Sequence, residues 1–142
     1  MIVLCTATTV STAAPEAFFA RWADMGTWPE WDDALAWTRL DGPFAEGATG
    51  VLKPRHGPTA RFVIETLEPG AEFTDVSMLP GARLRIRHLT EADQVRRTRV
   101  TVEVSIDGPL SGLWALVLRR SVTRSTARGV RRLADVVEGN VA

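Results

Sequence analysis

Apolar and polar side chains alternate along several stretches of this chain, which is typical of strands with one buried face. In residues 83–88 (RLRIRH), arginines occupy every second position. The opposite face therefore carries Leu84, Ile86 and His88. Residues 98–106 alternate in the same way, with Val100 on the apolar face and Thr98 beside it. These two segments predict neighbouring strands whose apolar faces meet a common core.

Two short helices are expected near the beginning of the chain. Residues 2–12, rich in Val, Ile and Thr, predict a first strand. Pro15 follows, a residue favoured at the first position of a helix. Thr27 and Glu30 have the spacing of a capping box, which predicts a second, very short helix over residues 28–33.

The end of the chain predicts one long helix. Residues 110–138 contain no proline and only one interior glycine, Gly129, and Gly139 and Asn140 would close the helix. Between residues 35 and 107, turns rich in Gly and Pro separate five or six strands, so consecutive antiparallel pairing is expected. This order of elements predicts an α+β fold, a curved antiparallel sheet wrapped around the C-terminal helix.

Length and composition restrict the class of protein. A chain of 142 residues with 45% hydrophobic residues predicts one domain over residues 1–142. Acidic and basic residues balance at 17 each, which gives no support for a nucleic-acid or anionic-membrane partner. The longest apolar run, residues 113–118, is far below the roughly 18 residues that span a bilayer. With no basic segment before the apolar start, we expect a cytoplasmic protein without a membrane span.

Several kinds of chemistry find no motif in the sequence. The single cysteine, Cys5, has no partner for a disulfide or a thiolate metal site. Glycine-rich phosphate loops, nucleophile elbows and paired-histidine metal spacings do not occur. We therefore expect no metal and no cofactor.

Turn positions predict which side chains face inward from the middle of the sheet. Two-residue turns at Pro80–Gly81 and at Pro69–Gly70 would pair Asp75 with Ile86 on one side and with Ile64 on the other. In that register one face carries Phe62, Ile64, Phe73, Asp75, Leu84, Ile86 and His88.

Asp75 and His88 would then be diagonal neighbours, roughly 7–8 Å apart at the backbone. A carboxyl group and an imidazole in an apolar pocket can transfer protons, with Asp75 orienting His88. Two alternatives remain open: a one-residue bulge would turn Asp75 to solvent, and His88 can be a polar residue at a pocket rim. His56, in the loop over residues 54–58, is expected to be exposed and without a role.

The long helix carries a face whose side chains change in size along its length. Large residues at helical spacing are Trp114, Leu118, Val122, Leu133 and Val136. Small residues lie between them on the same side, namely Ser121, Ser125 and Gly129. This pattern predicts a cavity wall with two hydroxyl groups, or alternatively a close approach of helix and sheet.

Five short segments, in this order, resemble the START-like (SRPBCC) superfamily, and within it the polyketide cyclase/dehydrase and lipid-transport group. They are residues 13–19 (AAPEAFF), Asp24 with residues 28–31 (WPEW), residues 40–47 (LDGPFAEG), residues 98–101 (TRVT) and residues 108–110 (GPL). The resemblance implies a helix-grip fold with a deep, mostly apolar pocket between the sheet and the long helix. It also implies that Trp31 packs at one end of that pocket.

We expect an apolar, aromatic or polyketide-like small molecule to bind in this pocket. As an enzyme the protein would act as a cyclase or dehydratase by folding its substrate and moving protons, with His88 and Asp75 as the catalytic groups. The expected ligand-binding residues are Trp31, Phe62, Ile64, Phe73, Ile86, Thr98, Val100, Trp114, Leu118, Ser121 and Ser125.

Two other functions fit the same sequence. The pocket can belong to a carrier or sensor without catalysis. The arginines on the outer face of residues 83–88 and 97–99 can contact an acidic partner protein or a phosphate-bearing carrier, or can be a solvated face neutralised by Glu65 and Glu103. The protein would be a monomer or a homodimer.

Overall fold

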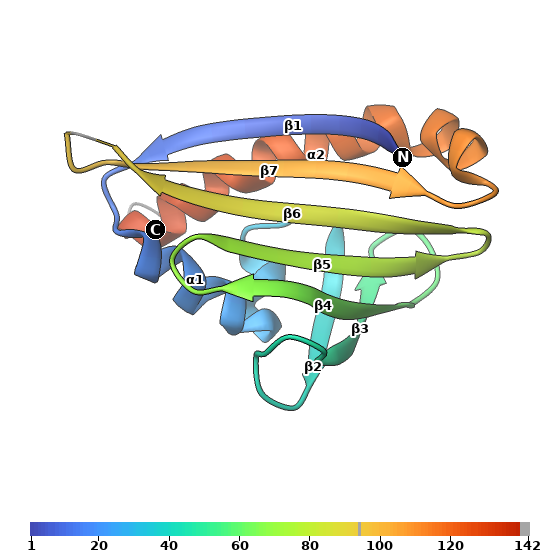
Figure 1. Ribbon diagram of the computed structural model, residues 1–142, viewed down its shortest axis with the longest axis horizontal. Coiled ribbons are helices and arrows are strands. Elements are labelled where there is room, and N and C mark those ends of the chain that lie inside the picture. Colours follow the sequence, from blue (N-terminus) through green and yellow to red (C-terminus); the bar gives the residue numbers. More distant parts are fainter. Residues whose placement is uncertain (94, 140–142) are drawn as a thin grey trace.

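The chain folds into a seven-stranded antiparallel sheet that curves over one long helix, α2 (Figure 1). This computed structural model describes residues 1–93 and 95–139. The elements in chain order are β1 (Ile2–Ser11), α1 (Pro15–Ala23), the 3-10 helix η1 (Met25–Glu30), β2 (Leu35–Asp41), β3 (Thr49–Pro54), β4 (Ala60–Glu68), β5 (Glu72–Leu79), β6 (Ala82–Ala92), β7 (Thr98–Asp107) and α2 (Ser111–Glu138). The predicted helix-grip architecture of the α+β class is confirmed.

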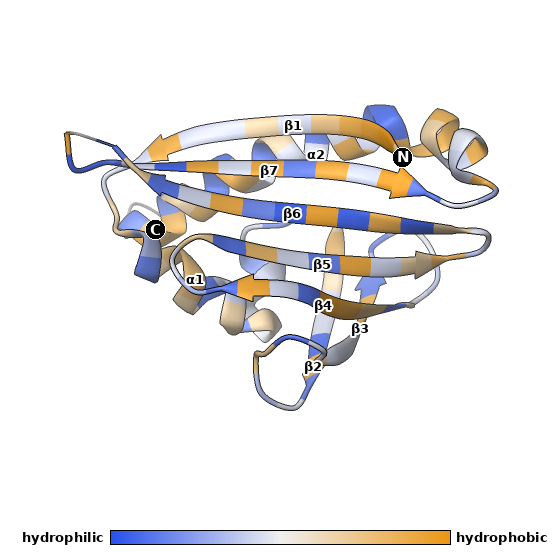
Figure 2. Ribbon diagram, in the orientation of Figure 1, coloured by the Kyte–Doolittle hydropathy of each residue, from blue (hydrophilic) through white to orange (hydrophobic). Residues whose placement is uncertain are grey.

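The sheet order β1-β7-β6-β5-β4-β3-β2 brings the first strand beside the last. All other neighbours are consecutive antiparallel strands, as the spacing of the turns predicted. Alternation is visible along β6, where hydrophilic and hydrophobic residues follow one another (Figure 2). One face of the sheet therefore meets the core, and the other meets solvent.

Helix α2 packs mainly against β1 and β7, at one side of the sheet. Its buried side chains include Ala115, Val130 and Leu133, and they meet the buried apolar residues of β7. Gly139 ends the helix with a φ of 77°, the left-handed conformation that favours glycine at this position. The predicted stop is therefore confirmed at Gly139, while Asn140 lies outside the described residues.

The register of the central hairpins follows the prediction, although one turn differs. Pro80–Gly81 forms a two-residue connection, and Asp75 pairs with Ile86 as expected. The β4–β5 connection contains three residues instead of two, because Glu68 pairs with Glu72. A bulge between Ile64 and Thr66 then restores the predicted pairing of Ile64 with Asp75. The extra turn residue and the bulge cancel, so Asp75 points inward.

The second short helix differs from the prediction. It spans Met25–Glu30 as a 3-10 helix, and no side chain caps its start. The hydroxyl of Thr27 donates to the carbonyl oxygen of Asp24 at 2.7 Å, so it does not accept a helix N–H. The carboxylate of Glu30 pairs with Arg21 at 3.4 Å instead of reaching back to Thr27. The expected capping box is therefore wrong.

The outer arginines of the sheet are neutralised by nearby acids. Arg85 lies between two carboxylates, 2.9 Å from Glu65 and 3.1 Å from Asp107. Arg87 pairs with Glu72 at 3.0 Å. These pairs support the interpretation of a solvated face. Glu65 neutralises it as expected, and Asp107 and Glu72 have the neutralising role that was expected for Glu103.

Gly50 shows a close approach inside the sheet. A methyl group at this position would overlap the ring of Phe62 and the carbonyl oxygen of Arg39. Because the carbonyl belongs to the backbone of β2, it cannot move without disturbing the pairing of β2 with β3.

We expect Gly50→Ala to lower the free energy of unfolding by about 2–3 kcal/mol, since overpacking inside a sheet strains its neighbours. Urea unfolding measures the change. Gly112→Ala is the matched control, because no atom lies within 4 Å of its added methyl group. In the first turn of α2 it should leave stability unchanged or raise it by up to ~1 kcal/mol. Equal effects of the two substitutions would contradict the packing argument.

Candidate functional site

A cavity of about 770 Å³ lies between the sheet and α2. This volume falls within the roughly 300–1,000 Å³ of small-molecule sites. Its walls come from β5, β6, β7, α2, η1 and the β3–β4 loop, and most of them are apolar. The cavity exists because α2 lies over β1 and β7, and the two short helices close only one end of the sheet.

Eight of the predicted site residues line this cavity. They are Trp31, Asp75, Ile86, His88, Trp114, Leu118, Ser121 and Ser125. The side chains therefore come from two strands, from the long helix and from the end of η1. The expected grouping of Asp75 with His88 is present in the structure.

Five other predicted residues are buried but do not belong to the lining: Phe62, Ile64, Phe73, Thr98 and Val100. Alternation predicted the correct face for them, but it carries no information about how far the cavity extends along a strand.

Each of the polar or aromatic members of this group has another contact. The ring of Phe62 packs over Gly50. The ring of Phe73 stacks on the ring of His88, with ring centroids 4.6 Å apart and planes 16° from parallel. The hydroxyl of Thr98 donates to the carbonyl oxygen of Ala13 at 2.6 Å, which ties β7 to the chain before α1.

His88 is held by the strand beside it. Its Nδ1 lies 3.0 Å from the carbonyl oxygen of Phe73, an acceptor, so Nδ1 carries the proton and donates it. Nε2 is then the acceptor atom of a neutral ring. Burial lowers the pKa of His88 to about 4, and the bond to Phe73 opposes the shift only in part. At neutral pH His88 is an uncharged base.

Asp75 is a buried carboxyl group without a hydrogen bond to any other described residue. Its exposed fraction is 1%, and neither of its oxygens has a partner among the described residues. Its Oδ1 lies 3.8 Å from Nδ1 of His88, which is too long for a hydrogen bond. Desolvation raises the pKa of Asp75 to about 7. The expected orienting role belongs instead to the carbonyl of Phe73, because it accepts the Nδ1 proton.

Asp32 is a second carboxyl group on the cavity wall, and the sequence interpretation missed it. Its Oδ1 accepts the backbone N–H of Ala34 at 3.0 Å. Burial raises the pKa of Asp32 to about 6, and its charge contributes to the raised pKa of Asp75. The neighbouring Asp33 pairs with Arg128 at 3.1 Å. Two adjacent aspartates following Trp31 were the available sequence signal.

Aromatic rings surround His88. The ring centroid of Trp22 lies 5.0 Å from that of His88, and that of Trp28 lies 6.4 Å away. Both indoles line the cavity. The indole N–H of Trp28 donates to the carbonyl oxygen of Trp22 at 3.1 Å, so a hydrogen bond fixes this ring. His88 therefore lies among aromatic rings, and Asp75 is buried beside it.

Residues of a loop and of α2 complete the lining of the cavity. The β3–β4 loop contributes Arg55, His56 and Pro58 to the lining. His56 is exposed, as expected, yet it lies at the rim of the site. On α2, the hydroxyls of Ser121 and Ser125 donate to helix carbonyls at 3.2 and 3.3 Å, so their free lone pairs can accept from a ligand.

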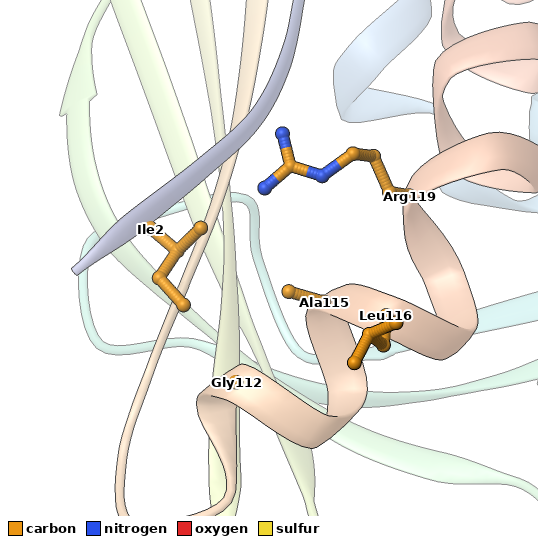
Figure 3. Close-up of a pocket in the computed structure, with 5 residues that line it drawn as sticks. All are labelled: Ile2, Gly112, Ala115, Leu116 and Arg119. Atoms are coloured by element: carbon orange, nitrogen blue, oxygen red, sulfur yellow. The ribbon is translucent and has the colours of Figure 1, made fainter.

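A second, shallower groove of about 350 Å³ lies between the start of β1 and the start of α2. Figure 3 shows Ile2, Ala115 and Leu116 around it and the guanidinium of Arg119 above it. Its lining contains no acid and no histidine. It is therefore separate from the site of Asp75 and His88.

Among residues 1–93 and 95–139, no three His, Cys, Asp or Glu side chains cluster as metal ligands. No helix within these ranges is long and apolar enough to cross a membrane.

The sequence matches one family model over residues 3–138, and this model describes polyketide cyclases/dehydrases and lipid-transport proteins. The chain belongs to this family, within the SRPBCC superfamily that its motifs resemble. The search of curated proteins finds no matching relative.

Solved structures with the same fold have distant sequences. The di-domain aromatase/cyclase StfQ of steffimycin biosynthesis has a TM-score of 0.77 and 14% identity, over 97% of this chain and 51% of its own. A hypothetical protein from Helicobacter pylori has a TM-score of 0.76 and 10% identity, over 93% and 86%. Norcoclaurine synthase from Thalictrum flavum has a TM-score of 0.70 and 7% identity, over 94% and 91%. The chain spans about half the length of StfQ, and identities this low support the fold alone.

The buried state of Asp75 makes a prediction about stability. Its pKa is raised from 3.8 to about 7, so between these values the folded protein holds a proton that the unfolded chain releases. Stability from this group is therefore lost as the pH rises, by up to ~4 kcal/mol. Asp75→Asn removes this pH-dependent loss of stability. The free energy of unfolding of the variant minus that of the wild type should therefore increase from pH 4 to pH 7.

Urea unfolding at a series of pH values measures this difference. The pKa of His88 is lowered from 6.5 to about 4, which gives the opposite pH dependence, but His88 is present in both proteins and cancels in the comparison. Asp135→Asn, at an exposed position of α2, is the matched control for the exchange of a carboxyl group for an amide. A pH-independent difference for Asp75→Asn would show that Asp75 is ionised in the folded protein.

Proposed function

We propose that this protein binds an apolar, aromatic or polyketide-like molecule in the cavity and catalyses its cyclisation or dehydration by proton transfer. One observation carries the proposal. Asp75 is fully buried on the cavity wall, has no hydrogen-bond partner among the described residues, and lies beside the neutral His88. Burying a carboxyl group without a partner costs several kcal/mol of stability. A role toward a ligand accounts for that cost.

The two pKa values assign the roles. Burial moves the pKa of Asp75 up to about 7 and that of His88 down to about 4, so the usual order of a carboxyl and an imidazole is reversed. Asp75 is then the acid and His88 the base over the range between them. Above the pKa of Asp32, about 6, the negative charge of Asp32 helps to keep the proton on Asp75.

The proposed dehydration step follows from these roles. Nε2 of His88 removes a proton from the carbon beside a carbonyl group of the substrate. The electron pair forms the new carbon–carbon double bond, the carbon–oxygen bond of a β-hydroxyl breaks, and the carboxyl proton of Asp75 converts the leaving group to water. The proton on His88 then returns to Asp75 through water. In a cyclisation, the same carbanion attacks a second carbonyl, whose oxygen Asp75 protonates.

The apolar walls would supply the rest of the catalysis. Rings and aliphatic side chains of Trp31, Ile86, Trp114 and Leu118 line the cavity and would hold a flexible chain folded. Folding brings the reacting carbons together, and exclusion of water strengthens the effect of Asp75 and His88. StfQ is described as an aromatase/cyclase and norcoclaurine synthase as a synthase, which supports small-molecule chemistry on this fold.

The pH dependence of turnover tests the assignment. An aromatic β-hydroxy ketone is a suitable substrate, since its loss of water gives an absorbing enone. We expect kcat/KM to fall below about pH 4, where His88 is protonated, and above about pH 7, where Asp75 is ionised. Asp75→Asn and His88→Gln should each lower kcat by about a hundredfold or more.

Asp135→Asn serves as the control and should keep full turnover, because this exposed residue does not line the cavity. Unchanged turnover in Asp75→Asn would reject the catalytic role. Native mass spectrometry of the fresh protein distinguishes the alternative, a carrier or sensor. A bound molecule that leaves unaltered, with no product formed, would favour the carrier.

Ligand binding can be tested apart from catalysis by filling the cavity. Ser125→Trp places a large ring in the lining, and we expect the affinity for the apolar fluorophore anilinonaphthalene sulfonate to fall at least about tenfold. Thr123→Trp, on the exposed side of α2, should bind the fluorophore as the wild type does. Thermal unfolding confirms that both variants are folded. Equal affinities would place the fluorophore site outside the cavity.

A further inference from the structure

Large apolar side chains are exposed on the first two turns of α2. Leu113, Leu116 and Val117 have exposed fractions of 61%, 84% and 64%. In Figure 2 these turns lie at the end of the sheet where the chain begins. Isolated exposed leucines are ordinary in proteins, but three on one short surface make a patch.

The same side of α2 continues as a row of arginines. Arg120, Arg124 and Arg131 follow Leu113 at helical spacing, and all three are exposed. No carboxylate lies within ion-pair distance of them in the described part of the chain. We call this surface, made of Leu113, Leu116, Val117, Arg120, Arg124 and Arg131, the outer face of α2.

The charge of this helix is one-sided. Residues 111–134 contain six arginines and no acidic residue, although the whole chain has a net charge of zero. One of the six, Arg128, pairs with Asp33, and Arg119 donates to the carbonyl oxygen of Val3 at 3.4 Å. The two acids of α2, Asp135 and Glu138, lie in its last turn. Over residues 111–134 the outer face of α2 therefore has a positive field of its own.

The groove beside the patch adds apolar surface to it. Ile2 from β1 faces Ala115 and Leu116 across the groove, and Arg119 covers one side (Figure 3). The apolar surface thus continues from the first strand to the first turns of α2.

We propose that the outer face of α2 docks on an anionic lipid bilayer. Leu113, Leu116 and Val117 enter the layer between the headgroups and the acyl chains, and the arginines that follow contact lipid phosphates. Basic residues beside exposed leucines are the pattern of helices that lie in a membrane interface. Leu113 and Val117 line neither cavity, and Leu116 lines only the shallow groove beside β1. The three side chains project outward from the helix, as apolar residues of a helix lying in a membrane interface do, which favours a bilayer over an acidic protein.

The docking surface adjoins the opening of the large cavity. Trp114, Leu118 and Ser121 line that cavity, and they alternate along the helix with the exposed residues of the patch. Arg124 belongs to both surfaces. Docking therefore brings the cavity opening close to the bilayer, where apolar molecules are concentrated. The docking itself does not depend on any catalytic role of Asp75.

Flotation with lipid vesicles tests the proposal. The whole protein is mixed with vesicles of phosphatidylcholine alone or of phosphatidylcholine with phosphatidylglycerol. We expect binding only to the anionic vesicles, and this binding should weaken as salt is added. Arg120→Glu with Arg131→Glu should weaken binding at least about fivefold per residue. Leu113→Ser with Leu116→Ser should weaken it about tenfold or more.

The matched control reverses two arginines on the opposite side of the sheet. Arg61→Glu with Arg99→Glu changes the net charge equally at exposed positions, and binding should fall far less than for the α2 pair. All variants change exposed side chains, so thermal unfolding should remain that of the wild type. Equal loss in both charge variants, or absence of vesicle binding, overturns the proposal. A dimer in solution that the leucine variant converts to monomer would assign the patch to contact between two copies.

Discussion

The position of α2 on the sheet is the constraint on which the other features depend. The helix buries its apolar side against β1 and β7, since the closure of β1 onto β7 brings these two strands together beneath it. The inner faces of the other strands then have no long helix above them. The short elements α1 and η1 cover one end only, so a space of about 770 Å³ stays open between β5, β6 and α2. A helix placed across the middle of the sheet would fill this space.

Within that space, the free energy of burial determines the chemistry. The same low-polarity surroundings that favour the apolar residues also disfavour any charge, so they raise the pKa of Asp75 and lower that of His88. Burial in the cavity wall therefore favours the neutral form of both groups. Such a pair is costly for stability and gives the site a proton donor and a proton acceptor that are both neutral over the same pH range. Stability and reactivity thus have a single origin, the removal of water by the surrounding rings.

The architecture and the inward direction of Asp75 and His88 could be predicted from the sequence. Alternation in β6 and the Pro80–Gly81 turn depend on local residues only, and they determine the register of β5 with β6. The three-residue turn and the bulge near Glu65 could not be predicted from the sequence. In each case the chain adopts one of several local conformations of similar energy. Their shifts cancelled, so the pairing of Asp75 was correct although the turn was not. The extent of the cavity could not be predicted in this way. Ile86 lines the cavity and Val100 does not, and this difference depends on where the helices pack, which the alternation along a strand does not record.

Net charge was the weakest guide to the surface of this protein. A sum of zero argues against an anionic partner only if the charges are mixed evenly, and here they are not. Acids lie beside the arginines of the sheet and neutralise them, as Glu65 and Asp107 do around Arg85. Helix α2 has no acid over residues 111–134, so Arg120, Arg124 and Arg131 on its outer face keep their field. At about 0.15 M salt the field of a charge extends only about 8 Å, and a partner therefore meets the local face rather than the total. The distribution of charge over each element is the quantity that bears on binding.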